Sequence, residues 1–264
     1  MPNRLNRVKV AKSFDSAANS YDVSARLQRY TGKHLLPLLS NKHNSTVIDL
    51  GCGTGFFTEL LATKFEKVIG LDMSSQMLAY TQKNRKGISS LIAADAYHLP
   101  LQKNSIDVIY SNLMIQWCEN LSEVVREILR VLRPGGHFVF TTLLDETLHE
   151  LKSAWGQVDQ DKHVIDFKKE VEINAVFQNV GDMPCELLDY NVQDVILEYE
   201  NVMHLAHELK GLGANHVPTK QNKGLAGKGK WQKMIKAYED FIEPTGVYPA
   251  TYRVYSGLVV KLND

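Results

Sequence analysis

The chain has few of the features that mark disulfide-linked or membrane-spanning proteins. It contains three cysteines among 264 residues, and no two of them are spaced as C-x-x-C. We therefore expect neither a disulfide framework nor a zinc site, and we expect a reducing compartment. No apolar run approaches the ~20 residues of a spanning helix, and the first residues lack the apolar core of a signal peptide. The sequence predicts a cytoplasmic protein with no membrane partner.

Net charge of either sign is lacking as well. Lys and Arg total 30, as do Asp and Glu, so the formal net charge is zero. The charge of the whole chain therefore gives no reason to expect nucleic acid as a partner. Hydrophobic residues make up 44% of the chain, which is enough for a full core, and the length suits one large domain. The oligomeric state stays open.

The most informative stretch is residues 47–55, which read Val-Ile-Asp-Leu-Gly-Cys-Gly-Thr-Gly. A short apolar run ends at Asp49, and Gly51, Gly53 and Gly55 follow. This pattern predicts a buried parallel strand that enters a turn close to a ligand, because glycine has no Cβ and tolerates positive φ. The spacing G-x-G-x-G differs from the G-x-G-x-x-G of dinucleotide folds, which disfavours a nicotinamide oxidoreductase.

A second predicted strand ends in an acid. The apolar run 68–71 leads into Asp72, seventeen residues past Gly55. An acid at the tip of the neighbouring strand, beside a glycine turn, is placed to accept hydrogen bonds from two ribose hydroxyls. The two features together predict a nucleoside ligand, and they do not predict a pyrophosphate.

From residue 45 onward, predicted strands and helices alternate, which is typical of a parallel sheet with helices on both faces. The expected strands are 46–50, 67–71, 89–93, 106–110 and 137–143, and the expected helices are about 55–64, 74–83 and 121–131. Apolar residues at helical spacing also cover 8–40. After a polar, helical stretch over 145–183, we expect a short strand at 185–190, a helix at 194–209 and a last strand at 252–262.

These segments resemble the class I S-adenosylmethionine-dependent methyltransferases. The glycine turn resembles their motif I, Ala94-Asp95-Ala96 resembles the acidic turn that reads the adenine amino group, and residues 107–112 and 132–136 resemble strand four and the turn before strand five. The resemblance implies a Rossmann-like α/β fold: a seven-stranded, mostly parallel sheet with an antiparallel last strand and helices on both faces. The implied cofactor is S-adenosylmethionine, and the residues expected to bind it are Asp49, Gly51, Gly53, Gly55, Asp72, Met73, Asp95, Ala96 and Asn112.

The same resemblance implies one methyltransferase domain over residues 1–264. An N-terminal helical lid is expected over 8–40, and the cofactor-binding core over 45–143. Insertions that form a cap or contact the substrate are expected over 145–183 and 194–247.

Further segments resemble one family within this class, the malonyl-acyl-carrier-protein O-methyltransferases of biotin synthesis. They are the N-terminal helix at 14–28, the loop at 111–118, the cap motif Leu-Lys-Gly-Leu-Gly-Ala-Asn-His at 209–216, and residues 248–252. The resemblance implies methyl transfer from S-adenosylmethionine to the free carboxylate of a malonyl thioester on acyl carrier protein or coenzyme A. The methyl ester would start pimeloyl synthesis for biotin.

This reaction suits a chain with no evident Ser/His/Asp or paired-carboxylate constellation. A carboxylate with a pKa near 4 is ionised at neutral pH, so the nucleophile needs no general base. The enzyme then has to align the reactants and exclude water, and in-line positioning can supply ~7–11 kcal/mol.

Four side chains are candidate substrate-positioning residues: Tyr21, Trp117, His216 and Arg253. Tyr21 belongs to the N-terminal signature and is expected in a lid near the methyl donor, although an aromatic on an apolar helix stripe usually packs in a core. Trp117 is either a wall of the transfer chamber or ordinary packing. His216 and Arg253 are candidates for holding the malonyl group, with a surface ion pair as the alternative for Arg253.

A stretch rich in lysine and glycine spans residues 210–236. It holds seven lysines and no Asp or Glu, so the remainder of this neutral chain carries a charge of −7. One interpretation is a solvated, mobile loop. The other is a docking surface that steers an acidic acyl carrier protein, formed by Lys220, Lys223, Lys228, Lys230 and Lys233.

Two other functions remain as alternatives. A methyltransferase of a small hydrophobic molecule, such as a quinone precursor, would share the fold but should lack the cap motif and any reason for a basic cap. A non-catalytic cofactor-binding protein that acts through partners would be suggested by loss of the turn glycines or of Asp72, and all of them are present.

Overall fold

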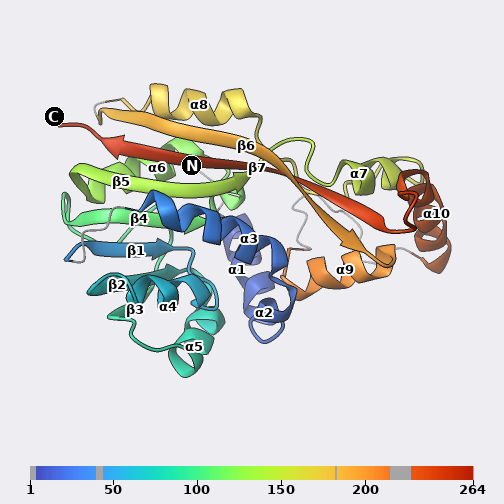
Figure 1. Cartoon of the computed structure of the whole chain (residues 1–264), viewed down its shortest axis with the longest axis horizontal. Helices are drawn as coiled ribbons and strands as arrows, with labels where there is room; N and C mark the ends of the chain where they lie inside the picture. Colours follow the sequence, from blue (N-terminus) through green and yellow to red (C-terminus); the bar gives the residue numbers. More distant parts are fainter. Residues whose placement is uncertain (1–3, 40–43, 182, 215–226, 264) are drawn as a thin grey trace.

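A seven-stranded sheet runs through the computed structural model, which describes residues 4–39, 44–181, 183–214 and 227–263 (Figure 1). Its strands are β1 (Thr46–Leu50), β2 (Lys67–Asp72), β3 (Ser90–Ala93), β4 (Ile106–Asn112), β5 (Leu132–Leu143), β6 (Cys185–Tyr199) and β7 (Tyr248–Lys261). They lie in the order β3-β2-β1-β4-β5-β7-β6. The first five strands are parallel, and β7 runs antiparallel to β5 and β6. The predicted fold class is confirmed.

The helices fall into three groups by position. Those that flank the sheet are α4 (Phe56–Ala62), α5 (Ser75–Asn84), α6 (Leu121–Val131) and α8 (Glu170–Gln178). The N-terminal helices are α1 (Arg4–Ala17), α2 (Tyr21–Ser24) and α3 (Arg26–Leu35), followed by the 3-10 turn η1 (Leu36–Leu38). The third group is α7 (His149–Gly156), α9 (Val202–Gly211) and α10 (Lys228–Tyr238), and short 3-10 turns also occur at η2 (Ile115–Trp117) and η3 (Glu239–Phe241).

Alternating side chains along the strands create two cores, one on each face of the sheet. On β4, Val108 and Tyr110 pack with α4 and η1, whereas Ile109 between them packs with α6 on the opposite face. All three are at most 1% exposed. The pattern follows from the buried parallel strand, in which both faces must be apolar.

The far ends of β6 and β7 extend beyond the other strands and carry α7, α9 and α10, which together we call the cap (Figure 1). The predicted helix at 194–209 is wrong for its first eight residues, because β6 continues to Tyr199 and α9 begins at Val202. Pairing with β7 decides this, since the register continues to Tyr199 opposite Tyr248. Buried Val195 and Tyr199 alternate with exposed neighbours, which is a strand pattern over a short distance.

Two further boundaries differ from the prediction. β5 begins at Leu132 instead of 137, with an irregular register opposite Ile106. The described end of the lysine-rich stretch forms α10, so residues 228–236 are not a loop. No helix among the described residues has the length and apolar character needed to cross a membrane. Cys52, Cys118 and Cys185 are free thiols.

The sheet order reverses between β1 and β4, because β1 connects outward to β2 while β4 lies on its other side. In open α/β sheets, ligands bind at the carboxyl ends of the strands where the order reverses. The N-terminal helices lie across this edge, beside the glycine turn and α5 (Figure 1). The fold therefore places the predicted ligand-binding residues under α1 and α2.

Candidate functional site

A cavity opens at the carboxyl ends of β1, β2 and β4. Its floor is formed by the glycine turn after β1 and by Asp72 and Met73 at the end of β2. Side chains of α1 and α2, including Phe14 and Tyr21, form its roof. The walls hold Asp95, Ala96 and Asn112 as well, so the cavity gathers most of the residues that the sequence predicts for the cofactor.

The three turn glycines have different structural reasons to be glycine. All have positive φ, namely +77° at Gly51, +54° at Gly53 and +71° at Gly55. A Cβ at Gly51 would lie 2.4 Å from Met114 Cγ, and one at Gly55 would lie 2.3 Å from Thr81 Cγ2. A Cβ at Gly53 would meet no protein atom within 4 Å. Gly51 and Gly55 thus shape the turn, while Gly53 keeps space free on the cavity side.

Asp72 is held by the backbone of the glycine turn and of the α5 entry. Its Oδ2 accepts a hydrogen bond from Gly53 N at 2.9 Å, and its Oδ1 accepts one from Ser74 N at 2.7 Å. Burial raises the pKa of Asp72, and these N–H donors oppose that rise. An ionised carboxylate has about four acceptor positions, so each oxygen can accept one more hydrogen bond. This arrangement fits the two hydroxyls of a ribose.

Asp49 lies below the turn instead of in the main cavity. It is 3% exposed, and its Oδ2 accepts a hydrogen bond from Thr58 Oγ1 at 2.6 Å. It lines a smaller adjoining cavity together with Gly51, Gly53 and Tyr21. Burial is the main reason why the pKa of Asp49 rises to about 7, and the nearby Asp72 carboxylate adds to the rise. A ligand with positive charge above the turn would favour the ionised form.

Asp95 and Asn112 already have protein partners. Asp95 forms an ion pair with Arg7 of α1, and it accepts a hydrogen bond from Tyr97 N at 3.1 Å. The Asn112 side chain accepts hydrogen bonds from Thr31 and Thr141 hydroxyls and donates one to the Gln28 carbonyl at 2.9 Å. Asn112 therefore ties α3 to the sheet at the cavity edge. The Arg7–Asp95 ion pair joins α1 to the side of the cavity that Asp95 lines.

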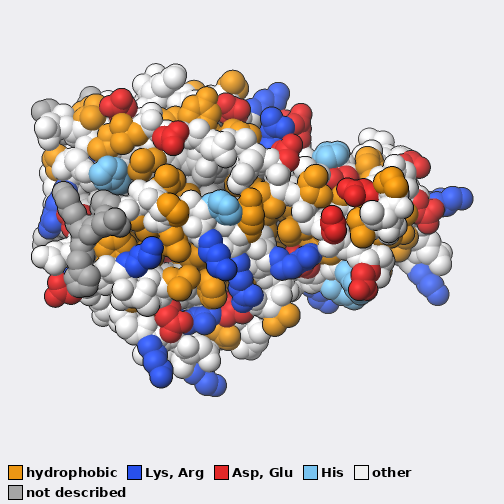
Figure 2. Space-filling model, in the orientation of Figure 1, with side chains coloured by type: hydrophobic (Ala, Val, Ile, Leu, Met, Phe, Trp, Pro, Cys, Tyr) orange, Lys and Arg blue, Asp and Glu red, His pale blue; other side chains and the backbone are white. Residues whose placement is uncertain are grey.

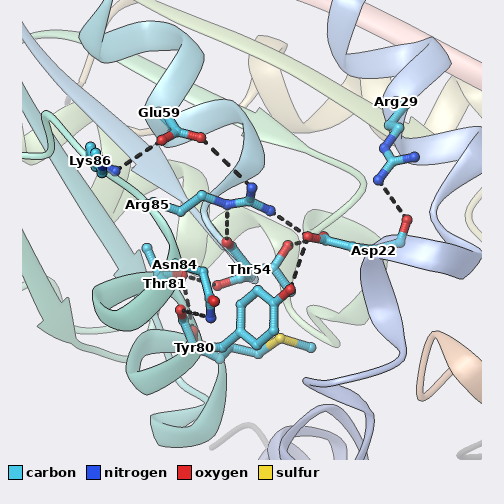
Figure 3. A network of polar contacts seen from close by, with 11 residues as sticks. Asp22, Arg29, Thr54, Glu59, Tyr80, Thr81, Asn84, Arg85 and Lys86 are labelled. Carbon is cyan, nitrogen blue, oxygen red and sulfur yellow. Dashed lines mark hydrogen bonds and ion pairs between the residues drawn. The ribbon is translucent and has the colours of Figure 1, made fainter.

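A second polar network ties α2 to the glycine turn and to α5 (Figure 3). Asp22 accepts a hydrogen bond from Thr54 Oγ1 at 2.6 Å and forms an ion pair with Arg85, which also lies 3.7 Å from Glu59. The Arg85 Nε–H donates to the Thr54 carbonyl at 3.0 Å. The network joins the N-terminal helices to the turn that shapes the cavity.

Asp15 makes a third tie between the N-terminal helices and the core. Its Oδ1 accepts hydrogen bonds from Ser74 Oγ at 2.6 Å and from Gln76 N at 3.1 Å. The sequence reasoning singled out neither Arg7, Asp15 nor Asp22 as a site residue. A usable signal existed, because these charged residues recur at intervals of about two helical turns on an otherwise apolar stripe.

Tyr21 and Trp117 lie together at the junction of this cavity with a larger hollow, and both line the two spaces. The Phe14 ring packs edge-on against Trp117 with centroids 5.4 Å apart, and it lies 6.4 Å from the Tyr21 ring. Burial, followed by the carboxylates of Asp72, Asp22 and Asp49, raises the pKa of Tyr21. Its hydroxyl therefore stays protonated and can donate a hydrogen bond.

The larger hollow extends from this junction into the cap between apolar walls that include Leu148, Trp155 and Val202. Two glutamines also line it. The Oε1 atoms of Gln28 and Gln116 are buried and have no hydrogen-bond partner among the described residues, whereas Gln116 Nε2 donates to the Leu113 carbonyl at 2.7 Å. Buried polar atoms without partners are rare, so these two point to a polar group that a substrate brings.

The structure does not bring every predicted residue to this site. Arg253 lines neither cavity, and its guanidinium lies 3.1 Å from Glu146 and 3.7 Å from Asp194, so the ion-pair alternative holds. The prediction that Arg253 contacts the substrate is not supported. His216, Lys220 and Lys223 lie outside the described residues.

The remaining docking lysines are on α10. Lys228 and Lys233 are exposed. Lys230 instead forms an ion pair with Asp159 at 2.7 Å and lies 3.9 Å from Asp161, so its charge is balanced within the cap. On the face shown in Figure 2, the end of the molecule formed by α7 and α10 carries both signs of charge, while Lys and Arg side chains gather over the N-terminal helices.

Comparison with known proteins agrees with this geometry. Residues 48–140 match the family described as methyltransferase domain. Among solved structures, the YcgJ protein of Bacillus subtilis aligns with a TM-score of 0.60 at 16% identity, over 89% of this chain and 100% of that one. The phosphoethanolamine N-methyltransferase 2 of Haemonchus contortus, solved with S-adenosylhomocysteine, aligns with a TM-score of 0.57 at 16% identity, over 94% of this chain and 58% of that one. The fold and the site define a class I S-adenosylmethionine-dependent methyltransferase.

Curated relatives narrow this class. The malonyl-acyl-carrier-protein O-methyltransferase of Yersinia pestis is 33% identical over 98% of this chain and 94% of its own length. The biotin biosynthesis bifunctional protein BioHC of Cellvibrio japonicus is 39% identical over 97% of this chain, which spans 51% of that longer protein. The chain belongs to the malonyl-acyl-carrier-protein O-methyltransferase family, as the N-terminal and cap motifs predicted.

Proposed function

We propose that the protein transfers the methyl group of S-adenosylmethionine to the free carboxylate of a malonyl thioester. The observation that carries this proposal is the junction at Tyr21 and Trp117, where the cavity beside the glycine turn meets a larger, mostly apolar hollow. Family membership over nearly the whole chain supports the same reaction. An acyl carrier protein that bears the malonyl group is the proposed partner, biotin synthesis is the proposed pathway, and the cytoplasm is the proposed location.

The cofactor supplies an electrophilic methyl group on a sulfonium centre. Asp72 and Gly53 would hold its ribose, since Asp72 keeps free acceptor positions and Gly53 leaves open space. Ala96 and Met73 would flank its base, and Asp49 would favour its positive charge from below the turn.

On the substrate side, the carboxylate is ionised at neutral pH and needs no base. The protonated Tyr21 hydroxyl can donate to it, and the Trp117 and Phe14 rings exclude water from the junction. Because the carboxylate and the sulfonium lose opposite charges as they react, a dry site favours the reaction over the charged ground state. The protein's contribution is therefore alignment and dehydration.

The proposal is tested by incubating the purified protein with labelled S-adenosylmethionine and one acceptor at a time. The acceptors are malonyl-carrier protein, malonyl-coenzyme A and a panel of small carboxylic acids and quinone precursors, and products are identified by mass spectrometry. We expect a methyl ester on the malonyl thioesters. Methylation of a small hydrophobic molecule with no reaction on malonyl thioesters would contradict the proposal, and the absence of any transfer would favour a non-catalytic role.

A further inference from the structure

The glycines of the cap motif let the end of α9 lie directly against the N-terminal helices. A Cβ at Gly211 would lie 2.3 Å from Ser24 Oγ, and one at Gly213 would lie 2.7 Å from the Ser13 carbonyl oxygen. The Ser20 hydroxyl donates to the Gly211 carbonyl at 2.9 Å. A side chain at Gly213 would meet the backbone of Ser13 and push the end of α9 away, whereas one at Gly211 would meet only the end of the Ser24 side chain. Gly213 therefore sets the distance between the end of α9 and α1.

This contact borders a hollow with a basic and hydroxyl-rich wall. Its described lining residues are Lys12, Ser13, Ser16, Ala17, Ser20, His207, Lys210, Gly211 and Gly213, and none of these is acidic. Lys12 and Lys210 are exposed, and neither forms an ion pair with another described residue. The hydroxyls of Ser13, Ser16 and Ser20 already donate to backbone carbonyls. Two lysines and a histidine around one hollow remain suited to an anion.

The nearest acid in α9 does not neutralise this hollow. Glu208 is turned to the other side, where it accepts a hydrogen bond from Arg26 Nε at 2.8 Å and one from the Tyr199 hydroxyl at 2.9 Å. Arg26 also lies over the Tyr199 ring, at 4.6 Å from its centroid. The carboxylate is thus occupied within the cap, and the positive charge of Lys210 stays available.

The hollow adjoins the larger apolar hollow through shared lining residues. It shares His207 and Lys210 with the larger apolar hollow, which in turn shares Phe14, Tyr21 and Trp117 with the cofactor cavity. By these shared residues, the three spaces adjoin one another in the order of a nucleoside cavity, an apolar hollow with two glutamines, and a basic hollow. A ligand that fits this order has a reactive end, an uncharged arm and an anionic far end.

We propose that Lys12 and Lys210 bind the phosphate at the far end of the pantetheine arm that carries the malonyl thioester. The inference rests on the proposed function, because it names how the substrate of that reaction is held. The phosphate is common to carrier protein and coenzyme A, so the subsite serves both. Lys210 opens the lysine-rich stretch 210–236 but is not among the five lysines predicted to dock the carrier protein. Of those five, Lys230 on α10 is already neutralised.

The test compares substrates with and without this phosphate in the Lys12→Ala/Lys210→Ala double variant. The substrates are malonyl-carrier protein, malonyl-coenzyme A and malonyl-pantetheine, which has no phosphate. We expect KM to rise about tenfold for both phosphate-bearing substrates, with kcat nearly unchanged, because two exposed charge-assisted contacts are lost. KM for malonyl-pantetheine should not change. Lys9→Ala is the matched control, since Lys9 is exposed on the same helix and lines none of the three spaces.

Several results would overturn the proposal. An equal rise of KM on all three substrates, or a rise confined to carrier protein or to coenzyme A, would mean that the lysines contact something other than the shared phosphate. No rise of KM on any substrate would mean that they do not bind the substrate. If the wild-type protein methylated no malonyl thioester, the proposed function would fail, and calorimetry would still decide the subsite. Phosphopantetheine should then bind the wild type better than pantetheine does, and the double variant should lose that preference; equal binding of the two ligands to the wild type would reject the subsite.

Discussion

The two ends of the molecule place their functional groups by different means. Around the glycine turn, backbone atoms fix the position of the key side chain, since Asp72 is held by Gly53 N and Ser74 N. In the cap, side chains hold one another: Trp155 stacks on His163 at 3.7 Å, and the Arg26–Glu208–Tyr199 cluster fixes α9. A site whose side chains are positioned by the backbone can bind the same ligand in many proteins of one fold. A site positioned by contacts between side chains can change from protein to protein with the substrate.

The largest expected effect of a single substitution is at Asp72. Asp72→Ala should weaken S-adenosylmethionine binding by roughly 2–4 kcal/mol, because an ionised acceptor of two ribose hydroxyls is lost. Calorimetric titration measures the effect. Alanine at Asp194, an exposed acid on the cap strand β6, is the control and should leave the affinity unchanged. An unchanged affinity in Asp72→Ala would remove the nucleoside assignment.

Substitutions of two neighbouring glycines distinguish the residue that shapes the turn from the residue that leaves space for the ligand. Gly51→Ala should lower the free energy of unfolding by about 2–4 kcal/mol, because an unfavourable φ is combined with overlap of Met114. Gly53→Ala meets no atom and should cost only about 1 kcal/mol of stability, yet it should weaken cofactor binding. Thermal unfolding and calorimetry on both variants test this, and a Gly53→Ala variant with wild-type affinity would contradict the assigned space.

The features that could be predicted from the sequence lie mostly around the glycine turn, and those that could not are contacts between residues far apart in the sequence. The strands up to β5, the glycine turn and Asp72 are encoded within short segments, because glycine spacing and apolar runs report local backbone needs. The Asp22–Arg85 pair joins residues 63 positions apart, and no local pattern reveals it. Residues 194–199 carry both helical and alternating features, and the pairing with β7 decided between them. Arg253 likewise received its partners from Glu146 and Asp194, which only the fold brings near.

Tyr21→Phe tests the role of the Tyr21 hydroxyl at the junction between the two ends. The ring would still pack near Phe14, but the hydroxyl donor would be lost, so turnover should fall about tenfold while cofactor affinity stays within twofold. Single-turnover rates and calorimetry give the two quantities. Tyr30→Phe is a matched control, because Tyr30 is exposed on α3 and lines none of the described cavities near the transfer site. Equal turnover in wild type and Tyr21→Phe would return Tyr21 to a packing role.

The smallest expected effect is a pH dependence of S-adenosylmethionine affinity that comes from Asp49 at the glycine turn. Burial raises the pKa of Asp49 to about 7, so in the free protein this carboxyl is mostly protonated at pH 6 and mostly ionised at pH 8. A positively charged ligand favours the ionised form, and S-adenosylmethionine affinity should therefore increase with pH through 7, by at most about tenfold between pH 6 and 8.

The sign is opposite for the stability of the free protein. Because the folded state binds the Asp49 proton more tightly than the unfolded chain does, the contribution of Asp49 to the unfolding free energy should decrease as pH rises from about 4 to about 7. Asp49→Asn should flatten both profiles, since the amide does not titrate and can still accept the Thr58 hydrogen bond. Calorimetric titrations at several pH values with wild type and Asp49→Asn provide the measurement. A wild-type affinity that is constant across this range would show that Asp49 does not respond to the charge of the ligand, and the turn would then act through shape and the ribose contact alone.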